Sequence, residues 1–181
     1  MPRTALITAK SDLAPEHQAA ADAVLKVFGH IRGPFSVLLH SPALAEQLVP
    51  MAGFVRDDTI VEPNLRFVAI LAAARECNAP YVWAAQVAQA RKHHIREDLI
   101  DHLRAQGDAA KLSAEERDVL NYTLQLTRTH HVDKATFDVL LNRHGVKWLV
   151  ELTATLNFFI FVSGIANAFE VDVPADGDRI R

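Results

Sequence analysis

Four side chains that could bind or orient a polar ligand lie close together in an otherwise apolar stretch. Arg75 precedes a helix break at 78–80, and Tyr81, Trp83 and Gln86 follow it. Because residues three apart on a helix are neighbours, the Trp83 indole N–H and the Gln86 amide could line one pocket. The alternative is structural, with Trp83 in the core and Gln86 paired with backbone groups.

His40 is the titratable side chain best placed to transfer a proton near neutral pH. It directly precedes Ser41-Pro42, a pair typical of a helix start. An imidazole there could act as general acid or base, with Tyr81 and Gln86 as orienting donors. The alternative is a histidine bonded to a nearby backbone group.

Two charges stand alone in apolar segments and need partners if they are buried. Arg75 ends the run 68–75, and Glu151 is the single charge in 148–169. An unpaired buried charge is very costly. We therefore expect a structural ion pair between Arg75 and Glu151.

The histidine pairs and the lone cysteine argue against metal and thiol chemistry. Adjacent residues on a helix point about 100° apart, so neither His93-His94 nor His130-His131 can chelate one ion from one face. Cys77 is the only cysteine, which excludes disulfides within the chain, CxxC pairs and cysteine-rich zinc sites. We expect no metal and no cofactor.

Composition and charge describe an ordinary globular domain. The 181 residues have a net charge of −3, so the chain lacks the basic field that a nucleic-acid partner requires. The first residues lack the apolar core of a signal peptide, which favours a cytoplasmic location. We expect a single domain, 1–181, with an irregular arm at 1–13 and a polar tail at 170–181.

Apolar residues recur at three- and four-residue spacing and glycine is scarce, which predicts an all-α bundle of about seven to eight helices. Pro50 is expected to kink its helix, Ser113 and Glu116 to form a capping box, and Gly145 to end a helix. The expected helical segments are 14–29, 42–51, 64–76, 81–93, 97–105, 113–130, 133–145 and 146–169, with a short apolar piece at 35–40.

The segment 146–169 is long and apolar enough for a membrane span. Glu151, Asn157 and Asn167 make lipid exposure unfavourable, and no basic flank sets an orientation. We expect instead a central helix buried on all sides, part of it in a subunit interface.

The stretch 64–90, with VAILAAAR and Tyr81-Val-Trp83, resembles the core of carboxymuconolactone decarboxylases and the AhpD-like superfamily. The segments 32–42 and 149–171 are similar to the longer decarboxylase-like branch, so the resemblance spans about 30–174. It implies an AhpD-like bundle, a homo-oligomer such as a trimer or hexamer, and a lyase of aromatic catabolism. Its substrate would be a small carboxylated, ring-derived organic acid. The residues expected to contact that substrate are Phe35, Trp83, Asn157 and Phe158.

The chain lacks the catalytic motifs of both groups that it resembles, the peroxidases and the decarboxylase-like members. The peroxidase cysteines fall on Ala79 and Val82, the relay histidine on Gln86 and the relay glutamate near Phe67. The decarboxylase-like run Tyr-Glu-Trp-x-x-His likewise has Val82 and Gln86 in place of its acid and histidine. Since glutamine cannot shuttle a proton near neutral pH, three possibilities stay open. These are a decarboxylase-like enzyme, a thiol peroxidase (disfavoured without cysteines) and a non-catalytic small-molecule-binding oligomer.

Overall fold

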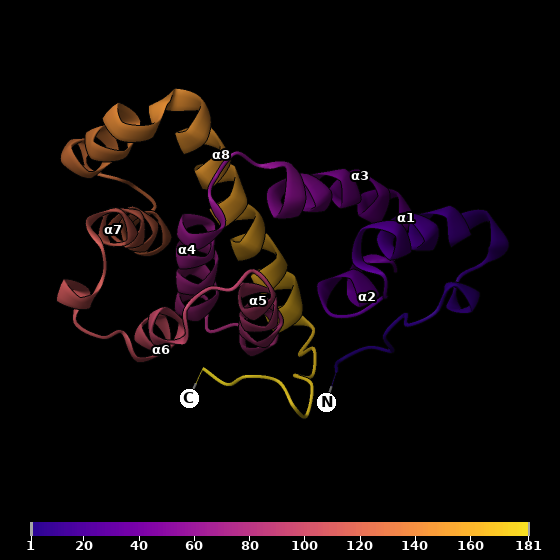
Figure 1. The fold of residues 1–181 in the computed structure, drawn as a ribbon. Coiled ribbons are helices and arrows are strands. Elements are labelled where there is room, and N and C mark those ends of the chain that lie inside the picture. The colour runs from indigo at the N-terminus through magenta and orange to yellow at the C-terminus, as the bar shows by residue number, and fades with distance from the viewer. Residues whose placement is uncertain (1, 181) are drawn as a thin grey trace.

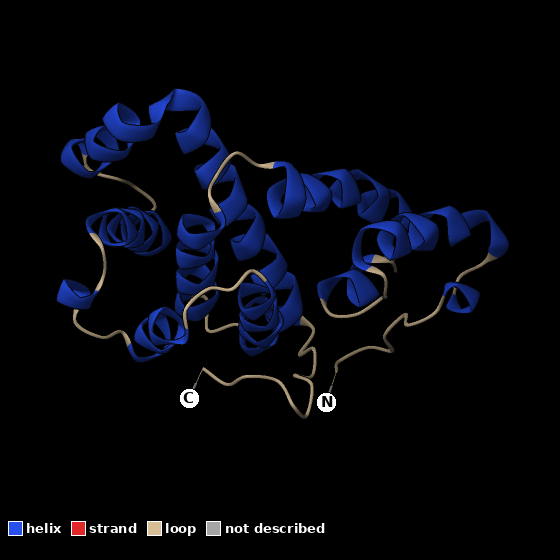
Figure 2. Cartoon of the chain, in the orientation of Figure 1, coloured by secondary structure: helices blue, strands red, loops and turns tan. Residues whose placement is uncertain are grey.

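Helices make up the regular structure of the chain. The computed structural model describes residues 2–180, apart from the Ala109 side chain, and this range contains eight α-helices and no strand (Figure 2). The all-α prediction is therefore confirmed. The helices are α1 (Gln18–Phe28), α2 (Pro34–Leu38), α3 (Pro42–Gly53), α4 (Pro63–Glu76), α5 (Pro80–Lys92), α6 (Glu97–Ala105), α7 (Ala114–Thr129) and α8 (Lys134–Ala168).

Helix α4 forms the centre of the bundle. Ten successive residues, 65–74, are buried, and α5, α6, α7 and α8 all pack against it (Figure 1). Helices α1, α2 and α3 form a smaller lobe, which contacts the bundle where α2 packs on α8.

Helix α8 lines this contact but is not buried on all sides, contrary to the sequence-based expectation. Its inner face includes Trp148, Leu152 and Phe159, whereas Val146 and Val150 are 66% and 60% exposed. By length and composition α8 is the one helix in the described range that could cross a membrane. The core helix of a helical domain meets the same criteria, and α2, α4, α5 and α7 pack on α8.

Several helix boundaries follow from local sequence. Proline occupies the first turn of α2, α3, α4 and α5, where its missing N–H is not needed. The predicted capping box between Ser113 and Glu116 is formed at the start of α7. Gly145 interrupts α8 with a φ of +82°, so the predicted break between two helical segments is confirmed.

The end of α3 carries a feature that the sequence did not reveal. Pro50 lies inside α3, and the helix continues into a π-helical turn, Phe54–Asp58. This turn directs Arg56 toward α1, where its guanidinium donates to the Val27 carbonyl at 3.1 Å and lies over the Phe28 ring. The turn therefore places a cation between the two lobes.

Arg75 and Glu151 do not form the predicted ion pair. Arg75 Nε donates to the Arg104 carbonyl at 2.7 Å, while the Glu151 carboxylate accepts from the Thr59 hydroxyl and the Ile60 N–H. Arg75 is thus bound by the last turn of α6, and Glu151 by the segment between the π-helical turn and α4. Both charges needed partners, as expected, but backbone and hydroxyl groups of neighbouring segments supply them instead.

The C-terminal tail packs against α5 and α6. Asp178 accepts hydrogen bonds from Trp83 Nε1 at 3.0 Å and from the Arg91 and Arg104 guanidinium groups. Burial would raise the pKa of Asp178, but these hydrogen bonds, first that from Trp83, hold it below its usual value. The largely buried Asp178 carboxylate is thus the main anchor of the tail, and Arg104 Nε adds a hydrogen bond to the Arg179 carbonyl.

Asp178→Asn should loosen the tail and lower the free energy of unfolding by about 1–3 kcal/mol at pH 7. Because the pKa of Asp178 is depressed in the folded state, this contribution is present above the unfolded pKa, near 4, and is lost as pH falls through the folded value. Denaturant unfolding followed by tryptophan fluorescence from pH 3 to 7 measures it. The exposed neighbour Asp176→Asn is the control, and an equal loss for both variants would contradict the assignment.

Candidate functional site

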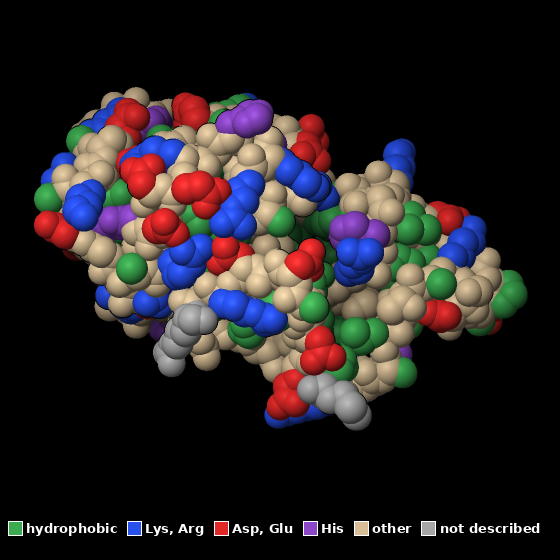
Figure 3. All heavy atoms as spheres, turned by 60° about the horizontal axis from the view of Figure 1, so that its bottom comes forward, with side chains coloured by type: hydrophobic (Ala, Val, Ile, Leu, Met, Phe, Trp, Pro, Cys, Tyr) green, Lys and Arg blue, Asp and Glu red, His purple; other side chains and the backbone are tan. Residues whose placement is uncertain are grey.

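A cavity of about 420 Å³ lies between the two lobes. Its walls come from the connection between α1 and α2, the π-helical turn, α5, α8 and the tail. Figure 3 shows the hollow lined with hydrophobic side chains and bordered by Lys, Arg and His side chains on one side and by acidic side chains on the other, and Asp176 and Asp178 are among the lining residues. The volume suits a small organic molecule.

Aromatic and aliphatic side chains form the apolar part of the cavity. Phe28 and Phe35 face each other with ring centroids 4.8 Å apart, and Phe158, Phe159 and Val162 approach from α8. Such a lining favours a flat, partly apolar ligand. Phe35 and Phe158 are two of the side chains that the sequence assigned to substrate contact.

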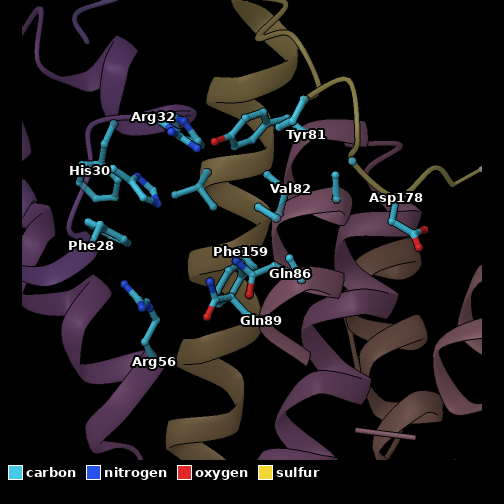
Figure 4. Close-up of a pocket in the computed structure, with 18 of the residues that line it drawn as sticks. Phe28, His30, Arg32, Arg56, Tyr81, Val82, Gln86, Gln89, Phe159 and Asp178 are labelled. Carbon is cyan, nitrogen blue, oxygen red and sulfur yellow. The ribbon is translucent and has the colours of Figure 1, made fainter. Parts of the chain in front are cut away.

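Cationic groups border the same cavity. Arg32, Arg56 and His30 line it (Figure 4), and Lys92 is a further lining residue. Arg32 and Lys92 form no ion pair with any residue in the described range, so their charges are available to a ligand. Burial, and then the charge of Arg32, lowers the pKa of His30. His30 is therefore mostly neutral at pH 7 and able to accept a proton.

Tyr81 presents its hydroxyl to this cationic group. The residue lies in the first turn of α5, and the hydroxyl points toward Arg32 (Figure 4). Burial raises the pKa of Tyr81, although Arg32 lowers it to a smaller extent. The phenol is consequently protonated at neutral pH and can donate a proton or a hydrogen bond.

Gly33 allows Tyr81 to take this position. A Cβ atom built on Gly33 would lie 2.1 Å from Tyr81 Cε1, and the φ of Gly33 is +64°. The backbone can approach the ring only because this residue has no side chain. The chain therefore uses a glycine to fix the direction of the phenol.

Gly33→Ala should displace the Tyr81 ring and destabilise the fold by about 2–4 kcal/mol through steric overlap and backbone strain. Thermal or denaturant unfolding measures the change. Gly164→Ala is the matched control, because Gly164 lies within α8 with open space around it and should be neutral or stabilised by about 0.4–1 kcal/mol. Equal stability of Gly33→Ala and wild type would show that the contact is not tight.

Two glutamine side chains from α5 complete the polar lining. Gln86 and Gln89 point into the space between α5 and the smaller lobe (Figure 4). Neither carboxamide has a hydrogen-bond partner in the described range. Gln86, predicted as a site residue, is therefore available to orient a ligand but not to transfer a proton.

Three of the predicted site residues do not line the cavity. His40 lies on the outer surface, with Nε2 2.7 Å from the Ala5 carbonyl, because the chain leaves α2 at Leu38 and turns outward before α3. Trp83 is fully buried and directed toward Asp178. Asn157 is exposed and donates to the Thr153 carbonyl. The expectation that His40 borders the pocket is corrected, and His30 occupies the place foreseen for it.

Cys77 is remote from the cavity. It caps the end of α4, half-buried, and burial followed by the charge of Glu76 raises its pKa. A raised thiol pKa leaves little reactive thiolate at neutral pH. Of the two positions where peroxidases carry cysteines, Val82 lines the cavity and Ala79 does not.

Sequence reasoning missed His30, Arg32 and Arg56 as site residues. His30 and Arg32 stand in the break between α1 and α2, beside Gly33 and Pro34. Polar residues in such a short connection can be functional because loops on a rigid scaffold carry binding groups. That signal could have identified His30 and Arg32, but nothing local identifies Arg56.

Comparison with known proteins supports the fold. No family model and no curated protein matches the chain, but solved structures do. A cysteine-to-alanine variant of the debrominase Bmp8, in complex with 2,3,4-tribromopyrrole, is 17% identical with a TM-score of 0.75, covering 97% of this chain and 95% of its own. An uncharacterized peroxidase-related protein from Silicibacter sp. TM1040 is 16% identical with a TM-score of 0.72, covering 99% and 98%.

A third match is the alkylhydroperoxidase AhpD core of a peroxidase-related protein from Ralstonia eutropha JMP134. It is 17% identical with a TM-score of 0.71, covering 96% of this chain and 95% of its own. The chain therefore has the AhpD-like helical fold, as the sequence resemblance implied. At these identities the matches define the fold and leave the activity to be argued from the site.

Proposed function

We propose that the cavity binds a small, flat, carboxylated organic acid derived from a ring and catalyses its decarboxylation. One observation carries the proposal. Cations and a protonated phenol face an apolar cavity that no thiol lines within the described residues. Apolar walls select a ring, and guanidinium groups select a carboxylate or enolate.

Decarboxylation fits this arrangement of charges. The bond between the carboxyl carbon and the ring carbon breaks, carbon dioxide leaves, and the electron pair remains on a conjugated carbonyl as an enolate. Arg32 and Arg56 would stabilise the enolate oxygen. Tyr81 would give its proton to the carbon and regain one from water.

The fold itself is compatible with small rings. Bmp8 has been described in complex with 2,3,4-tribromopyrrole, a flat five-membered ring. This supports the ring-shaped part of the proposed ligand. A thiol peroxidase function is disfavoured, because Cys77 lies outside the cavity and burial raises its pKa.

A second candidate is a binding protein that has lost turnover. It is favoured by Val82 and Gln86, which stand in the cavity where decarboxylase-like members carry a glutamate and a histidine. Titration with a panel of unsaturated ring acids, followed by a carbon dioxide release assay on those that bind, separates the two. Release supports the enzyme, whereas saturable binding without release supports the binder.

An assay of peroxide consumption with a dithiol as electron donor tests the alternative that the protein is a thiol peroxidase. We expect none above the uncatalysed rate. Cys77→Ser should leave binding of the ring acid unchanged, because the thiol does not reach the cavity. Dithiol-dependent peroxide turnover that disappears in Cys77→Ser would replace the proposed function.

We also propose that the chain self-associates through α8 in the cytoplasm. Val146, Val150 and Phe161 are exposed on one side of the helix, the last at 40%. Helical spacing of four and eleven residues aligns them, and exposed apolar side chains grouped on one side of a helix, here with Asn157 among them, are typical of an interface. A trimer or hexamer would cover it.

Light scattering should therefore give the mass of three or six chains at micromolar concentration. Val150→Glu combined with Phe161→Glu should shift the population to the monomer, because buried unpaired charges oppose association. Leu44→Glu, at an exposed leucine of α3, is the control and should leave the mass unchanged. A wild-type monomer would contradict the proposal.

A further inference from the structure

A second, smaller chamber adjoins the ligand cavity. It has a volume of about 20 Å³ and lies between the π-helical turn, α4, α5 and α8. Arg56, Gln86, Gln89 and Phe159 line both spaces. Arg66, from the buried helix α4, lines only the smaller one.

Arg66 is a buried cation without a partner. The residue is 5% exposed, and its guanidinium has no hydrogen bond or ion pair with any residue from 2 to 180. Its one specific contact is with the Phe67 ring, 5.7 Å from guanidinium carbon to centroid. Burial lowers the pKa of Arg66, yet an arginine remains charged in proteins. A largely buried cation that faces an open chamber without a protein partner is stabilised by an anion in that chamber.

The protein supplies too little negative charge around Arg66. Asp57 also lines the chamber, but it is exposed and forms no ion pair with Arg66, although its charge raises the pKa of Arg66. Arg56 adds a second cation on the same side. Two guanidinium groups therefore face one solvated carboxylate, which leaves the chamber with an excess of positive charge.

The chamber is also lined by hydrogen-bond donors that have no partner in the described part of the chain. The Gln86 and Gln89 carboxamides line the chamber, and neither has a partner in the described range. Each amide offers two N–H donors and the guanidinium offers five. Donors converging on one space, together with unbalanced positive charge, are the features of an anion site.

We propose that this chamber binds a single small inorganic anion of halide size, held by Arg66 and oriented by Gln86 and Gln89. A space of about 20 Å³ holds one particle the size of a water molecule. Arg66 lines this chamber and not the ligand cavity, so the cation that would hold the anion differs from those proposed to hold the organic acid. A water molecule could accept hydrogen bonds from Arg66, Gln86 and Gln89, but it would not neutralise the positive charge of Arg66. The inference does not depend on the proposed function.

Thermal unfolding at constant ionic strength tests the site. Replacing sodium gluconate, whose anion is too large, by sodium bromide should raise the melting temperature of the wild type by about 2–4 °C. Arg66→Met should lose this anion-specific rise. Arg117→Met, at an exposed arginine of α7, is the matched control and should keep it. An equal melting temperature in both salts would overturn the proposal.

Two further measurements keep the test independent of how Arg66→Met folds. Crystals of the unmodified chain grown in bromide should give an anomalous peak beside the Arg66 guanidinium, and a water molecule there instead would refute the site. Asp57→Asn should strengthen the bromide effect, because it removes a competing negative charge. If Asp57 is the true counter-ion, only Asp57→Asn responds to bromide while the wild type does not, and the proposal fails.

Discussion

Replacing Tyr81 by phenylalanine is expected to lower kcat for decarboxylation about 10²–10⁴-fold while KM changes little. The substitution removes one oxygen atom and keeps the ring that packs on Gly33. Binding through the apolar walls and the cations is therefore retained. Proton delivery to the enolate is lost, because His30 has a lowered pKa and carries little acid form at neutral pH.

Tyr122→Phe is the control for this substitution. Tyr122 is a buried tyrosine of α7 whose hydroxyl is 2.7 Å from Thr153 Oγ1, away from the cavity. The Tyr122→Phe substitution should lower the free energy of unfolding slightly and leave kcat unchanged. Steady-state kinetics of both variants give the comparison, and a Tyr81→Phe enzyme with wild-type kcat would remove Tyr81 as the proton donor.

Arg32→Met is expected to weaken binding of a ring carboxylate about 10–100-fold, the range for losing a charge-assisted hydrogen bond. Arg32 borders the cavity and has no ion-pair partner in the described range, so its charge is free to meet the ligand. Arg56 is a poorer test because it also supports Val27 and Phe28. Calorimetric titration measures the dissociation constant.

Lys26→Met provides the matched loss of one positive charge. Lys26 is exposed on α1 and does not line the cavity, so its removal should change the dissociation constant less than about twofold. An equal loss of affinity in Lys26→Met and Arg32→Met would show that net charge, rather than a contact with Arg32, holds the acid.

The parts of the fold that the sequence predicted were those with local causes. Proline in a first turn, the Ser113 capping box and the break at Gly145 each act within a few residues. The bounds of α6, Glu97–Ala105, agree fully with the expected segment. The π-helical turn after Pro50 was not predicted, because its geometry depends on how α3 packs against α1.

The direction of side chains was harder to predict than the helices. Trp83 and Gln86 are three residues apart on α5, but the tail draws the indole toward Asp178 while Gln86 faces the cavity. His40 was assigned to the pocket from its place beside a helix start, and the Ala5 carbonyl binds it on the outside. Both outcomes depend on irregular segments, whose path has no periodic signal in the sequence.

Of the seven residues predicted to act in catalysis or to contact substrate, four line the cavity. Phe35, Tyr81, Gln86 and Phe158 line the cavity as expected. The cations come from a loop and from the π-helical turn, which the helix pattern could not place. These cations change the kind of ligand that the cavity can bind. It gains a means of holding an anion, although the family's acid and histidine positions hold Val82 and Gln86.

The central claim is that this cavity recognises a ring through its apolar walls and a carboxylate through its cations. Calorimetric titration with an unsaturated ring acid and with its methyl ester, which has the same ring and no charge, tests it most directly. The acid should bind at one site per chain at least about 10-fold more tightly than the ester, with the difference reduced in Arg32→Met. Equal affinities for acid and ester, or no saturable binding of either, would contradict the account.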